Sequence, residues 1–389
     1  MNDGSGQSSL IVAGSLAQRP LHGGHAWVLL NLVRGFSRLG FEVTFLDRLE
    51  ESMYLDAQGS GVDDPGFNAG YLARLMRAFE VPRYSLLNGS RVLAGMDREE
   101  LLRVASRSAA LINVMGFLED EEVLERVDKR VFFDIDPGFW QMWRENGHGV
   151  RFEDHNAFVT IGENIGRSDC VIPTCSLPWI TTPQPVVLDD WEPAPNGDGA
   201  FTSVVSWRGP FGPIEHAGRT YGLRAHEFRK YLELPQRTSE RFELALDIDP
   251  ADERDRTALE SNGWALADPV QAAGDPWRYR DYIRRSKAEF MVAKNIYVDT
   301  HSGWFSDRSI CYLASGKPVL AQDTGIRERY PNGEGFLLFS TLDEAAEGVE
   351  EIAGDYERHS RAARAIAEEF FDSDKVLRSL LDRLEIGAP

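Results

Sequence analysis

The sequence has few cysteines, no long apolar run and a deficit of positive charge. Cys170, Cys175 and Cys311 are too few for a disulfide framework, and no second pair provides a zinc site. No apolar run approaches the ~20 residues that a membrane span requires. Lys and Arg number 42 against 62 Asp and Glu, and the formal net charge of −20 argues against a nucleic-acid partner. The polar N-terminus lacks a secretory pattern, so we expect a soluble cytoplasmic protein.

The composition is that of a globular protein with more than one domain. At roughly 150 residues per domain, the 389 residues predict two or three domains. Hydrophobic residues make up 42% of the chain and charged residues 27%, enough for two buried cores. Frequent Arg, Ala, Gly and Asp are associated with GC-rich bacterial genomes, where tailoring of secondary metabolites is common.

The first fifty residues predict the start of a parallel α/β sheet. An apolar strand at 9–13 leads into a loop that ends at Gly23 and Gly24, and a second strand follows at 41–46. Between them, apolar residues recur at helical spacing up to Gly40: Leu29, Leu32, Val33, Phe36 and Leu39. Strand, glycine loop, helix and strand in this order are typical of a Rossmann-like domain.

A proline-rich stretch from 173 to 199 separates two halves of this kind. Its six prolines are incompatible with a helix and with a central strand, so we interpret it as the crossing between domains, with Asn196-Gly197-Asp198-Gly199 at its end. Strands are expected again at 201–206, 242–248, 264–267, 289–293, 318–322 and 335–339. Two such halves predict an α/β protein with two Rossmann-like domains facing a central cleft.

We place the domain boundaries at this proline-rich stretch. Residues 1–185 are expected to form an N-terminal, acceptor-side domain, and residues 200–372 a C-terminal, nucleotide-binding domain. Residues 373–389 are expected to form a helix that packs back on the N-terminal domain.

The segment 289–325 is the most informative part of the chain. A strand, a loop containing Gly303 and a helix opening near Ser306 would present free backbone N–H groups to an anion such as a phosphate. His301, Arg308 and Ser309 would add side-chain donors. A simple helix cap at Ser306, with no ligand, explains the same pattern.

This segment resembles the nucleotide-sugar-binding region of glycosyltransferases of the GT-B architecture. His301, Gly303, Trp304 and Ser306 stand as in the T-H-x-G-W-x-S stretch of UDP-glucosyltransferases, and Gly316 to Gly325 resemble a G-x-P-V-(x)₄-G run. The C-terminal end is similar to retaining family-4-like transferases. The resemblance covers roughly the last 190 residues well. It implies a donor site at Arg208, His301, Ser302, Gly303, Trp304, Ser306, Arg308, Ser309, Asp323, Thr324 and Gly325.

The sequence departs from these families at the ribose. A glutamate that usually binds the donor ribose is replaced by Cys311, and the nearest acid is Asp307. Arg208 follows the first strand of the second half, where related transferases place an arginine against the diphosphate. An arginine fork can hold two phosphate oxygens, although a surface arginine in a loop fits equally well.

Candidates for the catalytic base lie in the first half. Gly23 and Gly24 would present N–H groups to the cleft, and His25 follows them, as in inverting relatives where a histidine deprotonates the acceptor. Asp134 and Asp136 end a strand and would also face the cleft as base or acceptor ligand. Capping and packing roles are open alternatives for all three side chains.

The expected function is transfer of a sugar from a UDP- or dTDP-type donor to a hydroxyl of a small-molecule or glycan acceptor. We expect no metal site and no cofactor other than the nucleotide sugar as co-substrate, because helix dipole and arginines would neutralise the diphosphate. Self-association is left open, as is the choice between inversion and retention.

Three alternatives share parts of this pattern. A nucleotide-sugar epimerase would use the same donor site, and a non-catalytic auxiliary protein would explain the missing glutamate. An NAD(P)-dependent oxidoreductase with Asp47 on the ribose lacks the required G-x-G-x-x-G loop.

Overall fold

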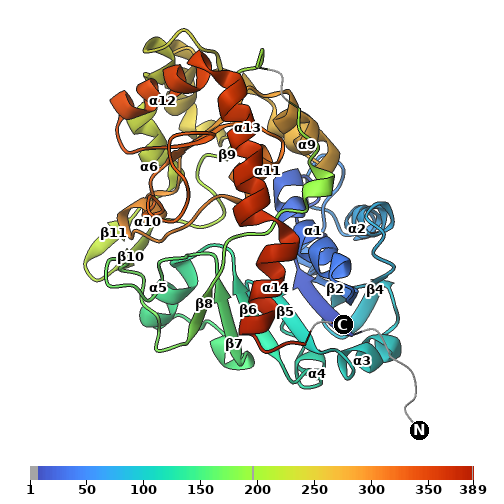
Figure 1. Cartoon of the computed structure of the whole chain (residues 1–389). Helices are drawn as coiled ribbons and strands as arrows, with labels where there is room; N and C mark the ends of the chain where they lie inside the picture. Colours follow the sequence, from blue (N-terminus) through green and yellow to red (C-terminus); the bar gives the residue numbers. More distant parts are fainter. Residues whose placement is uncertain (1–7, 195–196, 388) are drawn as a thin grey trace.

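Two α/β units, each built on a parallel sheet, make up the computed structural model, which describes residues 8–194, 197–387 and 389 (Figure 1). This confirms the predicted fold class. Pro195 and Asn196, which we assigned to the crossing, lie outside the described residues. No helix in the described ranges has the length and hydropathy to cross a membrane.

The N-terminal sheet has eight strands in the order β4-β3-β2-β1-β5-β6-β7-β8. All pairs are parallel except β3 with β4. Its strands are β1 (Ser9–Gly14), β2 (Glu42–Arg48), β3 (Arg83–Asn88), β4 (Arg91–Gly95), β5 (Ala110–Val114), β6 (Arg130–Asp134), β7 (Ala157–Thr160) and β8 (Trp179–Thr181). Its helices are α1 (Gly23–Arg38), α2 (Gly66–Ala78), α3 (Arg98–Ala105), α4 (Glu121–Leu124) and α5 (Phe139–Glu145).

The C-terminal sheet has six parallel strands in the order β13-β12-β9-β14-β15-β16. They are β9 (Phe201–Ser206), β12 (Phe242–Asp247), β13 (Ala265–Ala267), β14 (Ala288–Met291), β15 (Val319–Gln322) and β16 (Phe336–Phe339). The helices are α6 (Arg224–Phe228), α7 (Glu253–Ser261), α8 (Pro269–Ala273), α9 (Pro276–Arg285), α10 (Asn295–Asp299), α11 (Asp307–Ala314), α12 (Leu342–Gly354), α13 (Tyr356–Ile366) and α14 (Ser373–Arg383).

Burial explains why these segments form strands. The central strands are buried along nearly their whole length, as parallel strands covered on both faces must be, and they are therefore mostly apolar. Strand β8 lies within the proline-rich stretch that we read as unsuited to a central strand, and it occupies the edge of its sheet, where prolines are tolerated. A small hairpin, β10 (Ile214–His216) with β11 (Arg219–Tyr221), was not expected.

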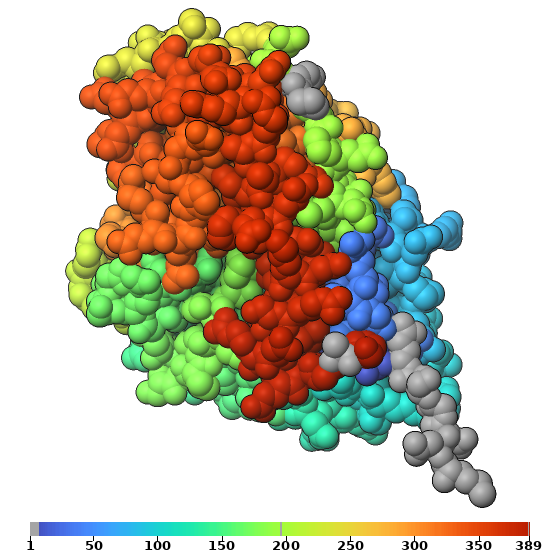
Figure 2. Space-filling model, in the orientation of Figure 1, coloured from blue at the N-terminus to red at the C-terminus, as the bar shows by residue number. Residues whose placement is uncertain are grey.

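The chain passes between the two units twice, and the two passages lie side by side. The Val186 N–H donates to the Phe371 carbonyl at 2.8 Å, and the Ser373 N–H donates to the Val186 carbonyl at 2.9 Å. Beyond this point α14 packs on α1, where a Cβ on Gly35 would come within 2.4 Å of Leu377. Figure 2 shows the C-terminal segment, in red, running from the upper unit over the lower one.

Candidate functional site

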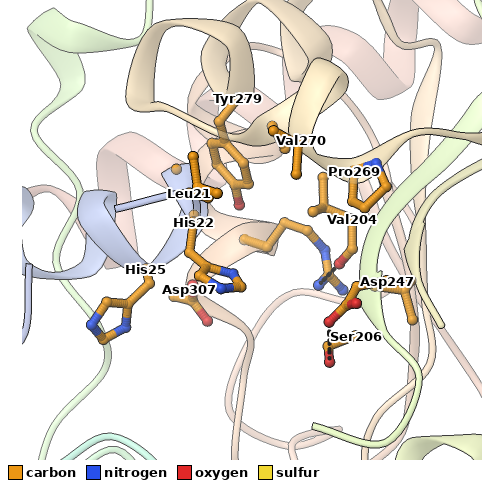
Figure 3. A pocket seen from close by; sticks show the side chains of 15 residues that line it. Leu21, His22, His25, Val204, Ser206, Asp247, Pro269, Val270, Tyr279 and Asp307 are labelled. Atoms are coloured by element: carbon orange, nitrogen blue, oxygen red, sulfur yellow. Dashed lines mark hydrogen bonds between the residues drawn. The ribbon is translucent and has the colours of Figure 1, made fainter. Parts of the chain in front are cut away.

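A cavity of about 400 Å³ lies where the two units meet, and its walls come from both (Figure 3). The N-terminal wall is the start of α1 and the loop before it. The C-terminal wall is formed by the ends of β9 and β12, by α8 and α9, and by the start of α11. The lining residues are Leu21, His22, Gly23, Gly24, His25, Val204, Val205, Ser206, Asp247, Pro269, Val270, Ala273, Tyr279, Asp307 and Arg308. The cavity therefore lies beyond the carboxyl ends of parallel strands, where ligands of such sheets bind.

The N-terminus of α11 opens into this cavity. Ser306 caps the helix by accepting a hydrogen bond from the Arg308 N–H at 3.2 Å. The Arg308 guanidinium pairs with buried Glu289 at 2.5 Å and donates from Nη1 to the Val204 carbonyl at 2.8 Å. Its Nη2 has no hydrogen-bond partner in the described part of the chain, and the residue is only 7% exposed. A buried, unsatisfied donor beside a helix N-terminus is suited to an anion.

Arg224 is a second arginine in this region, and we did not predict it from the sequence. Arg224 begins α6 and donates to the carbonyls of Val292 and Ser206 at 3.1 and 3.3 Å, with no carboxylate bonded to it among the described residues. Burial, followed by the nearby positive charge of Arg308, lowers the pKa of Arg224 to about 10. Two guanidinium groups this close attract an anion. No motif marked Arg224, because its proximity to Arg308 arises from the packing of α6.

Arg208, which we expected against the diphosphate, lies elsewhere. Its guanidinium holds Asp252 through two hydrogen bonds of 2.7 Å, its side chain is 54% exposed, and it does not line the cavity.

The loop preceding α11 faces the N-terminal unit. Asn164 donates its side-chain amide to the carbonyls of His301 and Gly325, at 3.1 and 2.9 Å, and its backbone N–H to Ser302. Gly303 has a φ of +71°, and a Cβ there would lie 2.6 Å from the Asn164 nitrogen. These predicted donor residues thus come together, but at a contact between the units rather than on the cavity wall.

The other predicted donor residues support this loop. Trp304 is buried and stacks on Tyr297 with ring centroids 4.4 Å apart, and Thr324 donates to its carbonyl at 2.6 Å. Asp323 accepts hydrogen bonds from the backbone of the turn that follows it, and Ser309 is buried within α11.

Gly23 and Gly24 line the cavity at the head of α1, and both are close to the opposite unit. A Cβ on Gly23 would lie 2.2 Å from the Asp275 carbonyl oxygen, and one on Gly24 would lie 2.8 Å from the Tyr279 ring. Glycine is therefore required here for the approach of the two units.

His25 lines the cavity but is engaged by its own unit. Its Nε2 lies 2.9 Å from the Ser15 hydroxyl. Burial, together with the positive charge of Arg19, lowers the pKa of the imidazole to about 3. The ring is therefore neutral near neutral pH and weakly basic.

Asp134 is fully buried and structural in its contacts. It accepts hydrogen bonds from the Gln141 amide at 2.8 Å, the Thr160 hydroxyl at 2.9 Å and the Asp136 N–H at 3.0 Å. Burial raises its pKa to about 6.

Asp136, by contrast, reaches the opposite unit. Both of its oxygens accept from the Lys294 ammonium at 2.8 Å, and Tyr297 donates its hydroxyl to one of them. Lys294 is 8% exposed and lies 4.9 Å from the centre of the Phe139 ring. Burial lowers the pKa of Lys294, and Asp136 partly restores it.

Two side chains bear on the ribose and oxidoreductase hypotheses. Cys311 is buried, its thiol donates to the Asp307 carbonyl, and burial raises its pKa. Asp47 is 1% exposed and accepts hydrogen bonds from the Ala17 N–H and the Gln18 amide, so it fixes the loop after β1 and is closed to a ribose.

A second cavity of about 360 Å³ adjoins the first and belongs wholly to the N-terminal unit. It shares Leu21 and His22 with the first cavity and is otherwise lined by Gln18, Arg19, Pro20, Met53, Leu55 and Gly59. Arg19 makes no side-chain hydrogen bond or ion pair within residues 8–194 and 197–387, although it interacts electrostatically with Asp136. In the described residues, no group of three or more His, Cys, Asp or Glu is arranged to hold a metal.

Comparison with known proteins identifies the fold. No family model and no curated protein matches the chain. An α-glucosyltransferase solved with UDP and a 13-mer DNA has a TM-score of 0.59 at 11% identity, over 98% of this chain and all of that one. Sucrose-phosphate synthase from Thermosynechococcus elongatus scores 0.56 at 12% identity (97% and 99% covered), and Anabaena HepE with UDP and glucose scores 0.54 at 10% (97% and 99%). The chain has the GT-B fold of glycosyltransferases, with two Rossmann-like domains facing a central cleft.

Proposed function

We propose that the protein transfers a sugar from a nucleoside diphosphate sugar to an acceptor hydroxyl without a metal ion. The observation that carries this proposal is the N-terminus of α11, which opens into the interdomain cavity with the unpartnered Nη2 of Arg308 beside it. The glycosyltransferases with a similar fold include enzymes whose structures contain UDP.

The donor would lie along the C-terminal wall. Its diphosphate would lie at the N-terminus of α11 and accept a hydrogen bond from Nη2 of Arg308, with the charge of Arg224 behind it. The uracil or thymine ring of a UDP- or dTDP-type donor would lie against the apolar side chains of Val204, Pro269 and Val270. The sugar would then point toward the head of α1, where the second cavity can hold an acceptor.

The reaction needs a leaving group, a nucleophile and a base. The acceptor oxygen attacks the anomeric carbon, the bond between that carbon and the diphosphate oxygen breaks, and the hydroxyl proton passes to the base. Of the predicted bases, Asp134 is enclosed and His25 is weakly basic, so we favour Asp136, once movement of the domains separates it from Lys294. Arginines and the helix dipole take up the charge of the leaving diphosphate.

A non-catalytic auxiliary role is the second candidate. It is favoured by the closed environment of Cys311, which stands where related enzymes bind the ribose, and by the engaged state of Asp136. An auxiliary protein would retain nucleotide binding without sugar transfer.

Calorimetry with UDP, dTDP, GDP and their glucose conjugates, in EDTA and then in magnesium, tests the proposal. We expect one nucleotide to bind in EDTA, and Arg224→Gln to weaken it at least about tenfold through loss of the positive charge behind the cavity wall. Arg208→Ala, with a guanidinium outside the cavity, is the matched control. Absence of binding to every nucleotide would refute the proposal, and binding without transfer to any acceptor would favour the auxiliary role.

A further inference from the structure

A carboxylate already occupies the place that the proposed diphosphate needs. Asp307 is the first residue of α11 and lines the cavity together with His22 and Arg308 (Figure 3). Within the described residues, its carboxylate is hydrogen-bonded only to its own backbone N–H. The helix N-terminus, which favours negative charge, is thus compensated before any ligand arrives.

The surrounding charges are balanced in the same way. Three cations act on this end of α11: Arg224, Lys294 and Arg308. Three carboxylates oppose them, of which Glu289 is paired with Arg308 and Asp136 with Lys294. Asp307 is the carboxylate of the three that has no side-chain partner. A diphosphate would add two negative charges to a cluster that has no excess of positive charge.

The least costly compensation is loss of the charge on Asp307. Protonating Asp136 or Glu289 would break an ion pair and leave its cation buried without a partner. Protonating Asp307 breaks no ion pair and converts a repelling carboxylate into a hydroxyl donor for a phosphate oxygen.

We propose that Asp307 couples donor binding to a proton: the nucleotide sugar binds when the Asp307 carboxyl is protonated, and donor binding therefore takes up one proton. This inference rests on the proposed function.

Burial supports this assignment, because it raises the pKa of Asp307 above its ordinary value before the donor arrives, and the diphosphate would raise it further. Other titratable groups face it from every neighbouring element: Cys311 and Arg308 on α11, Arg224 on α6, Lys294 before α10, Asp136 after β6, Glu289 on β14, Tyr279 on α9, and His22, His25 and Asp247 around the cavity. Burial holds the thiol and the phenol in their protonated forms.

The histidines are the competing proton acceptors. Burial lowers the pKa of both imidazoles, that of His25 to about 3, so both are neutral near neutral pH. His22 lies on the cavity wall with its side chain more open to solvent than that of His25, and it is therefore the alternative site of proton uptake.

Calorimetric titration of UDP-glucose in EDTA, in buffers of different ionisation enthalpy, counts the protons taken up. UDP-glucose is the probe because both of its phosphates are esterified and do not titrate near neutral pH. We expect uptake approaching one proton in the wild type and an affinity that rises as the pH falls, by up to tenfold per pH unit between the pKa of the free and bound forms. Asp307→Asn should bind without proton uptake and at least about tenfold more tightly than the wild type at about pH 8.

His22→Gln is the matched control and should keep the proton uptake. Unchanged uptake in Asp307→Asn, or its loss in His22→Gln instead, would overturn the inference and leave the proposed function standing. GDP- and dTDP-glucose replace the probe if UDP-glucose fails. If none of the three binds to the wild type or to Asp307→Asn, then the proposed function and this inference fall together. Asp307→Ser, with thermal melting of both variants, guards against a folding defect.

Discussion

The two sides of the interdomain cavity differ in how many of their polar groups already have hydrogen-bond or ion-pair partners. On the C-terminal wall, and counting partners among the described residues, Arg308 keeps one nitrogen without a partner and Asp307 keeps a carboxylate without a side-chain partner. On the N-terminal side, His25 is bonded to Ser15, and Asp136 is held by Lys294 of the opposite domain. The C-terminal wall, which we call the donor wall, can therefore engage a charged ligand once Asp307 is protonated, whereas the candidate base Asp136 is engaged in holding the domains together.

This difference follows from what each wall must do. A diphosphate has the same charge in every donor, so its site can be preformed on one rigid domain. The N-terminal domain also forms the domain interface around the cavity, where the Trp27 indole donates to the Pro276 carbonyl at 2.8 Å and Glu163 is bonded to Arg329 and Tyr330. We infer that domain opening frees its polar groups for an acceptor.

Removal of Arg308 should cause the largest loss of stability and of nucleotide binding, because Arg308 lines the donor wall and pairs with buried Glu289. Arg308→Gln leaves Glu289 buried without its cation, which we expect to cost about 3–5 kcal/mol in the free energy of unfolding. Urea denaturation measures this. The double variant Arg308→Met with Glu289→Leu should regain most of the stability without regaining nucleotide binding. Recovery of nucleotide binding in the double variant would show that Arg308 does not hold the donor.

Asp136→Asn tests the N-terminal side of the domain contact. It removes the charge partner of buried Lys294, and we expect a loss of about 1.5–3 kcal/mol in unfolding free energy, together with a fall in turnover of about 10²–10⁴-fold if Asp136 is the base. Asp134→Asn is the control within the same strand end, and nucleotide binding should persist in both. Normal turnover in Asp136→Asn would exclude it as the base.

We expect the stability of the protein to depend on pH through Asp47 of the N-terminal domain. Burial raises the pKa of Asp47 to about 8 from an ordinary 3.8, so the folded state binds more protons than the unfolded state between these values. Stability should therefore fall as the pH rises through this range, by about 2–5 kcal/mol in total. Denaturant unfolding at about pH 6 and about pH 8 checks the sign. Asp47→Asn should flatten the profile, and an unchanged profile would locate the titrating group elsewhere.

The smallest effect is expected at Arg208. Arg208→Ala removes an exposed ion pair with Asp252, and neither nucleotide affinity nor the melting temperature should change measurably. Isothermal calorimetry and thermal melting measure the two quantities. A clear loss of nucleotide affinity would mean that Arg208 swings from Asp252 to the diphosphate on binding, and would extend the donor wall beyond the cavity.

Much of the fold could be predicted from the sequence, because the local hydrophobic pattern agrees with the burial of the residues in the structure. The apolar runs of β1 and β15 are short and continuous, and the cap at Ser306 begins α11 as expected. The contacts at the site were harder to predict. His301 and Gly303 carry the family resemblance, but in the fold they meet Asn164, a residue some 140 positions earlier whose approach no local pattern announces.

The sequence by itself determined the alternation of strands and helices, and with it the two-domain class, because hydrophobic period and turn residues act over a few positions. It also marked the α11 N-terminus, since a cap and a glycine loop are local features. Only the tertiary structure decided which charges meet: that Arg308 pairs with Glu289, that Arg224 rather than Arg208 lies behind the cavity wall, and that Asp136 pairs with Lys294. Electrostatic partners are set by distance in space: the pairing of Arg308 with Glu289 exists only after the C-terminal domain has folded, and that of Asp136 with Lys294 only after the two domains have packed.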